Sequence, residues 1–188
     1  MNIPISLRPA GPDDLAAVYA LLEQCGLPIA DLQNNDRISF WLADSSGGTT
    51  PFVGVIGLER AGTFGLLRSL AVAPASRARG IARLLVEAAE LAAHADGLRA
   101  LYLIAMDERA AGCLAHLGYT PIARDLVPLA LRSLAEFTGL CPDSNPCLRK
   151  TLDPSFVETA IAMQETGNAG GANPCGCCRK SEPLADQG

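Results

Sequence analysis

A basic cluster stands directly before a long apolar-periodic run in this sequence. Residues 72–88 read VAPASRARGIARLLVEA, with Arg77, Arg79 and Arg83 placed around a single Gly80. A loop that ends at a helix start offers unpartnered backbone N–H groups, and the helix dipole favours an anion there. Glycine lets a ligand approach the backbone, and arginine adds charge for phosphate. The pattern predicts a phosphate-binding loop; a solvated basic helix start is the alternative that these residues leave open.

A second unusual residue is Arg68, which interrupts the apolar stretch TFGLLRSLAV. An arginine inside a strand is costly unless it is paired or faces a cavity. One interpretation is a guanidinium fork that, together with Ser69, binds an oxyanion on a substrate, such as a carboxylate, phosphonate or arsonate. The other is a structural salt bridge, for instance to Glu59. We carry the substrate-binding interpretation forward as the prediction.

Three of the seven cysteines lie close together near the C-terminus, at Cys175, Cys177 and Cys178. Such thiols suit a soft three-coordinate ion such as arsenite better than they suit tetrahedral zinc. The neighbouring Arg179 and Lys180 would help to keep them ionised. A tail without selected function explains the pattern equally well. The other four cysteines are expected to pack as small residues in helices and beside a turn: Cys25, Cys113, Cys141 and Cys147.

The composition excludes several classes of protein. The chain has 188 residues, a formal net charge of -5 and an apolar fraction of 49%, which describes one globular domain with some excess. An acidic chain argues against general nucleic-acid binding. No apolar run approaches the roughly 20 residues that cross a membrane, and the start MNIPISLRPAG lacks the pattern of a secretion signal. We expect a cytoplasmic protein with free thiols that binds neither membrane nor nucleic acid.

The elements that must position these residues follow the order β-α-β-β-β-α-β-α-β-α-β, a mixed α/β sheet followed by a tail. Helices are expected after Pro12, after Gly80, where apolar residues recur at helical spacing, over DERAAGCLAHLG with Gly118 as its stop, and over Leu126–Phe137. A short helix over 30–37, a turn at SSGGTT and a helix at SFVETAIAMQ are also expected. Strands are expected at ISLRPA, SFWLAD, FVGVIGLE, TFGLLRSLAV, ALYLIAM, YTPIAR and PCLRKTL.

Two motifs in this order resemble a known family. The strand LRSLAV, then Pro74, then Arg77-x-x-Gly80-x-Ala82 resembles the acyl-CoA motif of the GNAT superfamily of N-acetyltransferases. The stretch Asp107-Glu108-Arg109-Ala110, with Leu114 and Gly118-Tyr119, resembles the second motif of that family. The resemblance covers Ile3 to Leu152. The stretches LLRSLAVAP, GLE and LCPDSNPCLRK further resemble the arsenic-resistance N-acetyltransferases of bacterial arsenic operons.

The resemblance implies a GNAT-like α/β (α+β) fold, with a mixed, mostly antiparallel sheet that is flanked by helices and splayed at the acyl-CoA site. It implies acetyl-CoA as co-substrate and a homodimer. Pantetheine would pair with backbone between LRSLAV and ALYLIAM, and the pyrophosphate would lie on the N–H groups of the loop and helix start. The cofactor-binding residues are then Leu70, Ala71, Val72, Arg77, Ala78, Arg79, Gly80, Ile81, Ala82, Arg83 and Asp107.

The sequence departs from the family at the positions of proton transfer. Arg68 and Ser69 occupy the strand region where many members carry a glutamate, and Leu114 stands where many carry a tyrosine. A thiol with a pKa near 8.5 leaves tolerably without a proton donor, so the loss need not abolish transfer. Glu59 is the remaining catalytic-base candidate; the alternative is an exposed acid paired with Arg60. Tyr119 is a candidate acid if it faces the cleft, and a packing residue otherwise.

The two histidines, His94 and His116, are expected at the surface of helices. The prediction is therefore an acetyl-CoA-dependent N-acetyltransferase domain over residues 1–152 and a C-terminal helix with a Cys-rich tail over 153–188. Its acceptor is a small amino-group substrate, such as an arsenic-related or toxic amino-acid analogue. The rival hypothesis is a non-catalytic protein that binds arsenite or another thiophilic metal on a GNAT frame.

Overall fold

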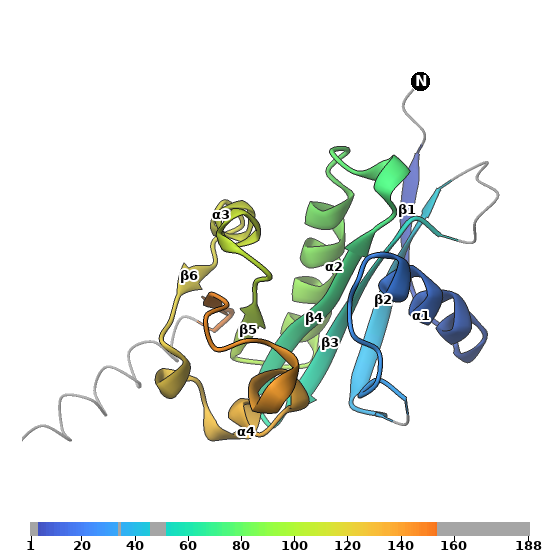
Figure 1. The fold of residues 1–188 in the computed structure, drawn as a ribbon. Helices are drawn as coiled ribbons and strands as arrows, with labels where there is room; N and C mark the ends of the chain where they lie inside the picture. The colour runs from blue at the N-terminus through green and yellow to red at the C-terminus, as the bar shows by residue number, and fades with distance from the viewer. Residues whose placement is uncertain (1–3, 34, 46–51, 154–188) are drawn as a thin grey trace, which may run out of the picture. The chain divides into compact units, whose positions relative to one another are not determined.

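The computed structural model describes residues 4–33, 35–45 and 52–153. Its centre is a seven-stranded sheet in the order β1-β2-β3-β4-β5-β7-β6 (Figure 1). All neighbouring strands are antiparallel except β4 and β5, which are parallel, so the expected mixed, mostly antiparallel sheet is confirmed. The strands are β1 (Ile5–Pro9), β2 (Ile38–Ser45), β3 (Gly54–Ala61), β4 (Phe64–Val72), β5 (Ala100–Ile104), β6 (Thr120–Pro121) and β7 (Cys147–Thr151).

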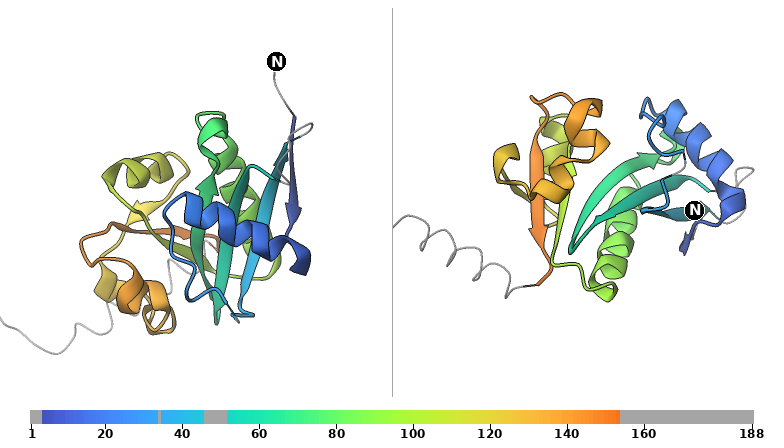
Figure 2. Two further views of the ribbon diagram at one scale, coloured as in Figure 1. Left: turned by 45° about the vertical axis from the view of Figure 1, so that its right-hand side comes forward. Right: turned by 90° about the horizontal axis from the view of Figure 1, so that it is seen from below.

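Helices cover both faces of this sheet. They are α1 (Leu15–Gln24), α2 (Ile81–Ala95), α3 (Glu108–Ala115) and α4 (Leu129–Arg132). Figure 2 shows α1 and α2 on opposite sides of the strands. The larger core lies between the sheet and α2, where Leu85 and Ala89 are fully buried, and the smaller one lies under α1 around Val18 and Leu22. Burial of these apolar faces is the main force that fixes both helices on the sheet.

Close packing in the middle of the sheet depends on one glycine. A Cβ on Gly65 of β4 would lie 2.6 Å from a Leu58 methyl and 2.7 Å from a Leu101 methyl. Contacts this short would force the surrounding core apart. Gly65 therefore lets β4 pair tightly with β3 on one side and with β5 on the other.

Three expected elements differ in the structure. Residues 30–33 and 36–37 form turns rather than a helix, because their side chains and backbone serve short-range bonds such as the Asn35 Oδ1 contact to the Arg37 N–H at 3.2 Å. The single helix expected over Leu126–Phe137 is broken, since Pro128 starts a separate short α4 and a π-helical turn follows at Glu136–Leu140. The strand expected at YTPIAR is reduced to β6. The expected turn SSGGTT, apart from its first residue, and the helix SFVETAIAMQ lie outside the described residues.

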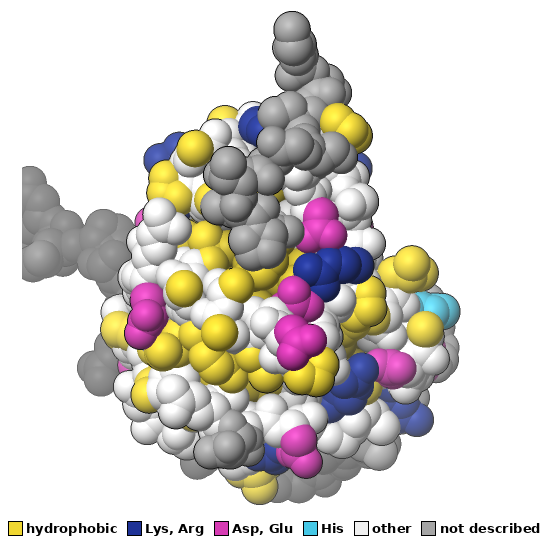
Figure 3. Space-filling view, turned by 90° about the vertical axis from the view of Figure 1, so that its right-hand side faces the viewer, with side chains coloured by type: hydrophobic (Ala, Val, Ile, Leu, Met, Phe, Trp, Pro, Cys, Tyr) yellow, Lys and Arg dark blue, Asp and Glu magenta, His cyan; other side chains and the backbone are white. Residues whose placement is uncertain are grey.

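The face that carries β1 and α1 mixes hydrophobic with charged side chains (Figure 3). One ion-pair network on these elements joins Arg8 of β1 to Asp14 at 2.7 Å and to Asp44 at 2.9 Å. This network ties the start of α1 to the edge of the sheet. Within the described ranges, none of the helices has the length and apolar character that a membrane span requires.

Candidate functional site

The sheet opens between β4 and β5. The two strands pair from Phe64 with Ala100 only as far as Leu67 with Leu103, while β4 continues to Val72. The N–H of Ala73 bonds to Val53 of the neighbouring chain segment at 2.8 Å, so Ala71 and Ala73 point their backbone groups toward β3. The backbone N–H and C=O groups of adjacent strand residues point to opposite sides. Leu70 and Val72 therefore direct their backbone groups toward the opening. The V-shaped gap implied by the resemblance is present.

A groove of about 660 Å³ lies along this end of β4 and the start of α2. We call it the α2 groove. Its size lies within the range of small-molecule and cofactor sites. Of the eleven residues predicted to bind the cofactor, nine line it, and Arg79 and Asp107 do not: Leu70, Ala71, Val72, Arg77, Ala78, Gly80, Ile81, Ala82 and Arg83.

The start of α2 is shaped to leave backbone N–H groups accessible. Gly80 is the N-cap with φ +76°, and Ala78 also lies in the left-handed region with φ 60°. No side chain caps this helix start, so its first N–H groups have no side-chain acceptor. Such a terminus attracts an anion through both its free donors and its dipole. Glycine is required at position 80 because other residues adopt this backbone only under strain.

The three arginines of the loop have different surroundings. Arg77 donates from Nε to the Val72 carbonyl at 3.1 Å and so braces the loop against β4. Arg83 pairs with Glu87, one turn further along the helix, at 2.7 Å. Arg79 is exposed outside the groove lining. Two of the three arginines, Arg77 and Arg83, therefore line the groove that contains the predicted anion site, and each has a partner within the chain.

A second hollow of about 300 Å³ occupies the gap between β4 and β5. We call it the β4–β5 pocket. Its polar lining consists of Arg68, Ser69, Asp107, Glu136 and Cys141. The α2 groove and the β4–β5 pocket adjoin, because they share six lining residues: Leu27, Leu70, Val86, Met106, Ala110 and Leu114.

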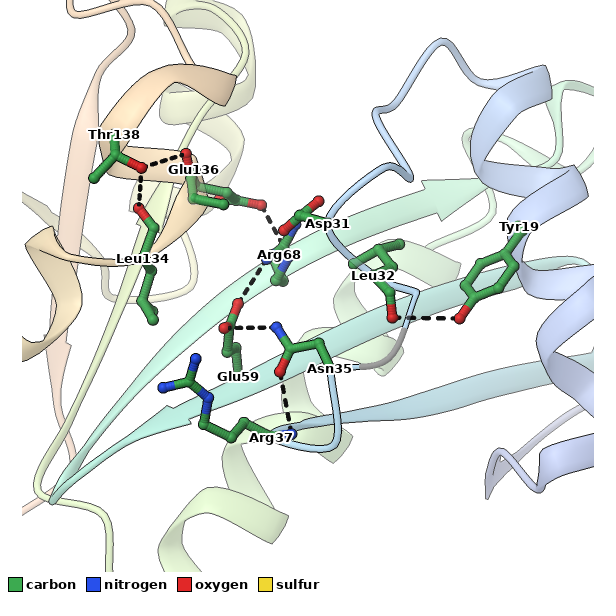
Figure 4. Close-up of polar contacts among 11 residues, drawn as sticks. Tyr19, Asp31, Leu32, Asn35, Arg37, Glu59, Arg68, Leu134, Glu136 and Thr138 are labelled. Atoms are coloured by element: carbon green, nitrogen blue, oxygen red, sulfur yellow. Dashed lines mark hydrogen bonds and ion pairs between the residues drawn. The ribbon is translucent and has the colours of Figure 1, made fainter.

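Arg68 is buried in the middle of β4 and is surrounded by carboxylates (Figure 4). Its Nη1 donates to Glu59 at 2.6 Å, its Nη2 lies 2.6 Å from Asp31, and its Nε lies 3.1 Å from Glu136. All three nitrogens lie within ion-pair distance of a carboxylate of the chain, which favours the salt bridge over an oxyanion fork. The substrate-fork interpretation is corrected to the salt bridge that was its alternative, with Glu59 as one of three partners. Ser69, beside it, does line the pocket.

Glu59 is not placed to act as a base. Its side chain is 2% exposed and lines neither hollow. Besides Arg68, it accepts a hydrogen bond from Asn35 Nδ2 at 3.0 Å. Arg60, the alternative partner expected for it, pairs instead with Asp96. Glu59 serves as an acceptor that anchors Arg68 and the 35–37 turn to β3.

Glu136 is the residue that the sequence did not single out. It is 7% exposed, yet its carboxyl lines the β4–β5 pocket beside Arg68. Burial raises the pKa of this carboxyl to about 7, with further raising from Asp31 and Glu59, while Arg68 opposes the shift. The available signal was a lone acid in the otherwise uncharged stretch 133–141. Asp31 was likewise missed, inside a stretch that was expected to be helical.

The remaining proton-transfer candidates lie elsewhere. Tyr119 is 2% exposed within the larger core, and burial raises the pKa of its hydroxyl, so it is the packing residue of the two alternatives. His94 and His116 are both exposed, as expected, although His116 borders the α2 groove. Leu114 forms part of the wall between the two hollows and offers no hydroxyl.

Asp107 caps a helix rather than lining the α2 groove. Its Oδ1 accepts the Ala110 N–H at 2.7 Å, which makes it the N-cap of α3. This contact satisfies one of the unpartnered donors of the helix start. The side chain thereby fixes α3, whose Ala110 and Leu114 face both hollows.

Thiols gather at the same end of the sheet without forming a metal site. Cys25 and Cys113 line the α2 groove, Cys141 lines the β4–β5 pocket, and Cys147 is buried. In the part of the chain that the structure describes, no three His, Cys, Asp or Glu side chains are arranged to hold a metal ion. The arsenite-binding candidates of the tail lie outside that part: Cys175, Cys177 and Cys178.

Comparison with known proteins agrees with this geometry. Residues 36–121, from the turn before β2 to β6, match the family model of the acetyltransferase (GNAT) domain. This segment of the chain is similar to the GNAT acetyltransferase domain, which supports an acyltransferase. No match was found among curated proteins.

Solved GNAT structures share the fold of this domain. A GNAT-family acetyltransferase from Staphylococcus aureus has a TM-score of 0.65 at 18% identity, over 80% of this chain and 100% of that one. Rv2747 from Mycobacterium tuberculosis, in complex with CoA, has a TM-score of 0.64 at 22% identity, over 78% of this chain and 99% of that one. N-acetylglutamate synthase from Neisseria gonorrhoeae, in complex with CoA and L-arginine, has a TM-score of 0.63 at 19% identity. The match covers 79% of this chain and 33% of that one. At these identities the likeness establishes the fold.

Proposed function

We propose that this domain is an acetyl-CoA-dependent N-acetyltransferase, with acetyl-CoA in the α2 groove and a small amino-group acceptor in the β4–β5 pocket. The observation that carries the proposal is the early end of strand pairing. Beyond Leu67 and Leu103, β4 runs on alone to the uncapped start of α2. A ligand there meets strand backbone first and helix N–H groups next.

The chemical groups of acetyl-CoA follow one another in the same order as their binding partners along the groove. The amides of pantetheine pair with the outward backbone of Leu70 and Val72 in the manner of an added strand. The pyrophosphate lies on the N–H groups that follow Gly80, with Arg77 and Arg83 at hand. Two of the neighbouring structures, from Mycobacterium tuberculosis and Neisseria gonorrhoeae, contain CoA, which supports the assignment of the co-substrate.

The thioester end of such a ligand falls where the two hollows meet, beside Leu114. Positioning the thioester against the amine lowers the barrier by several kcal/mol without any acid or base. The thiolate leaves without a hydroxyl donor because a thiol has a pKa near 8.5. The leucine at position 114 is therefore compatible with turnover.

We further propose that the acceptor is a toxic amino-acid analogue linked to arsenic, on the resemblance of LLRSLAVAP and LCPDSNPCLRK to arsenic-resistance acetyltransferases. A cytoplasmic homodimer is part of the same proposal. Release of CoA thiol is measured with acetyl-CoA and a panel of α-amino acids that carry a carboxylate, phosphonate or arsonate side group, with the acetylated product confirmed by mass. Turnover confined to simple amines would exclude the arsenic-linked acceptor. Binding of acetyl-CoA without turnover of any acceptor would exclude the transferase itself.

A further inference from the structure

We propose that Glu136 is a catalytic residue that takes up the proton from the amine nitrogen to which the acetyl group is transferred. The inference deepens the proposed function and rests on it. Arg68 occupies the strand region where many members of the resembled family carry a glutamate, so a base in this protein would come from another element.

The position of Glu136 meets the geometric requirement for a base. It lies on the wall of the β4–β5 pocket, which adjoins the α2 groove through Leu70, Met106 and Leu114. An amine in the pocket is thus between the carboxyl and the thioester end of the groove. A base has to lie within hydrogen-bond reach of the proton that it removes, directly or through one water. Among the carboxylates around Arg68, Glu136 alone lines this pocket.

The local structure holds the carboxyl in place. Glu136 begins a π-helical turn in which its carbonyl accepts the Cys141 N–H at 3.2 Å. The Thr138 hydroxyl bonds back to the Leu134 carbonyl at 3.2 Å (Figure 4). The turn presents Glu136 and Cys141 to the same pocket.

Burial and the neighbouring carboxylates raise the pKa of this carboxyl, against the effect of Arg68, so that it can exchange a proton near neutral pH. Arg68 faces it from β4, Glu59 from β3 and Asp31 from the segment after α1, so one cation is shared among three carboxylates. The pKa of Glu136 is raised to about 7, chiefly by burial. Two other titratable groups line the pocket. Burial raises the pKa of Cys141, so it stays a neutral thiol, and Asp107 accepts the Ala110 N–H at the start of α3. Asp31 and Glu59 are positioning residues that act through Arg68.

The step balances without any further reagent. The ionised Glu136 carboxylate takes one proton from the ammonium group of the acceptor, and the neutral amine attacks the thioester carbonyl. The C–N bond forms as the C–S bond breaks. The second nitrogen proton passes to the departing sulfur, which gives CoA thiol, the N-acetyl product and a protonated Glu136. Solvent then removes that proton.

The experiment compares Glu136→Gln with Asp31→Asn and with Glu90→Gln as matched control. Glu90 is a partly buried carboxylate paired with Lys150 at 2.7 Å, and it lines neither hollow. The probes are acetyl-CoA with n-butylamine and with 4-aminobutyrate. We expect Glu136→Gln to lower kcat about 10²- to 10⁴-fold and to leave the affinity for acetyl-CoA unchanged. The variant should also lose the acid limb of the pH–kcat profile, the fall of kcat below about pH 7 that protonation of Glu136 causes in the wild type. Glu90→Gln should match the wild type.

Asp31→Asn provides the readout that a merely structural role would not move. Removal of its charge lowers the pKa of Glu136, so the acid limb of the pH–kcat profile should shift to lower pH. Carboxyl ¹³C NMR of labelled glutamate follows the same titration without turnover, through a resonance that is missing in Glu136→Gln. A midpoint near pH 4.5 for the Glu136 resonance in this NMR titration would overturn the inference and leave the proposed function intact. A Glu136→Gln enzyme with the kcat and pH profile of the wild type would do the same. Failure of acetyl-CoA to bind would instead overturn the proposed function.

Discussion

The α2 groove and the β4–β5 pocket adjoin, but they are built in opposite ways. A single continuous stretch, residues 70–83, supplies ten of the nineteen residues that line the groove. The charged cluster behind the pocket wall is assembled from Asp31, Glu59, Arg68 and Glu136, which come from four separate segments, and Arg68 and Glu136 reach the pocket. The groove is thus a local feature of the chain, and the pocket is a product of tertiary packing. The same difference determines how each responds to mutation.

The largest expected effect lies at the centre of the pocket. Arg68→Met removes the one cation shared by three buried carboxylates, and a stranded buried charge costs about 3–5 kcal/mol of the free energy of unfolding. Denaturant titration at pH 7.5 measures the loss. Arg83→Met is the control, because its pair with Glu87 is exposed and exposed ion pairs contribute little to stability. A loss of less than about 1 kcal/mol in Arg68→Met would mean that the cluster is not a structural unit.

The second effect is the pH dependence of stability. Because the pKa of Glu136 is raised to about 7 from 4.5 in the unfolded chain, the folded state binds more protons between these values. The contribution of Glu136 to the free energy of unfolding of the wild type therefore falls as pH rises from 4.5 to 7, by up to about 3 kcal/mol. Glu136→Gln lacks this fall, so the difference between the two free energies of unfolding changes between pH 5 and pH 7.5. Parallel pH profiles would show an ordinary carboxyl at position 136.

A smaller effect separates the helix cap from the groove. Asp107→Ala removes the bond to the Ala110 N–H and should lower the free energy of unfolding by about 1 kcal/mol. Since Asp107 does not line the α2 groove, the affinity for acetyl-CoA in calorimetry should stay within a few-fold. A tenfold or greater loss of affinity would restore Asp107 as a cofactor-binding residue.

The smallest expected effect is at the C-terminal end. Truncation after Asp153 removes no strand of the described sheet, whose last strand ends at Thr151, so acetyl-CoA affinity should again stay within a few-fold. The same variant tests the tail thiols: arsenite stoichiometry that falls on truncation would support Cys175, Cys177 and Cys178 as ligands. Equal stoichiometry in both proteins would remove them from consideration.

The sequence predicted the groove because its determinants are local. The positive φ at Gly80 and the apolar periodicity of α2 follow from neighbouring residues, and the order of strands follows from the same kind of pattern. For Arg68, the sequence indicated a buried charge that needs a partner, but it did not identify the residues that pair with it. Asp31 and Glu136 reach it only after the segment following α1 and the π-turn have folded onto β4.

The errors in the predicted elements had the same cause. Pro128 split the expected helix 126–137, and the resulting π-turn is what turns Glu136 toward the pocket. Glu59 was expected at an exposed strand end, yet the turn that contains Asn35 covers it. In both places the side chain was visible in the sequence, while its burial depended on residues far away along the chain.

The central claim is that acetyl-CoA binds in the α2 groove with its pyrophosphate at the start of α2. Calorimetric titration of Gly80→Glu against Gly97→Glu tests it most directly. Both glycines have positive φ, +76° and +72°, with open space around a new Cβ, and they flank opposite ends of α2, so backbone strain is matched. We predict that Gly97→Glu binds acetyl-CoA as the wild type does, whereas the carboxylate of Gly80→Glu weakens binding at least about 100-fold. Equal affinity in the two variants would contradict the claim.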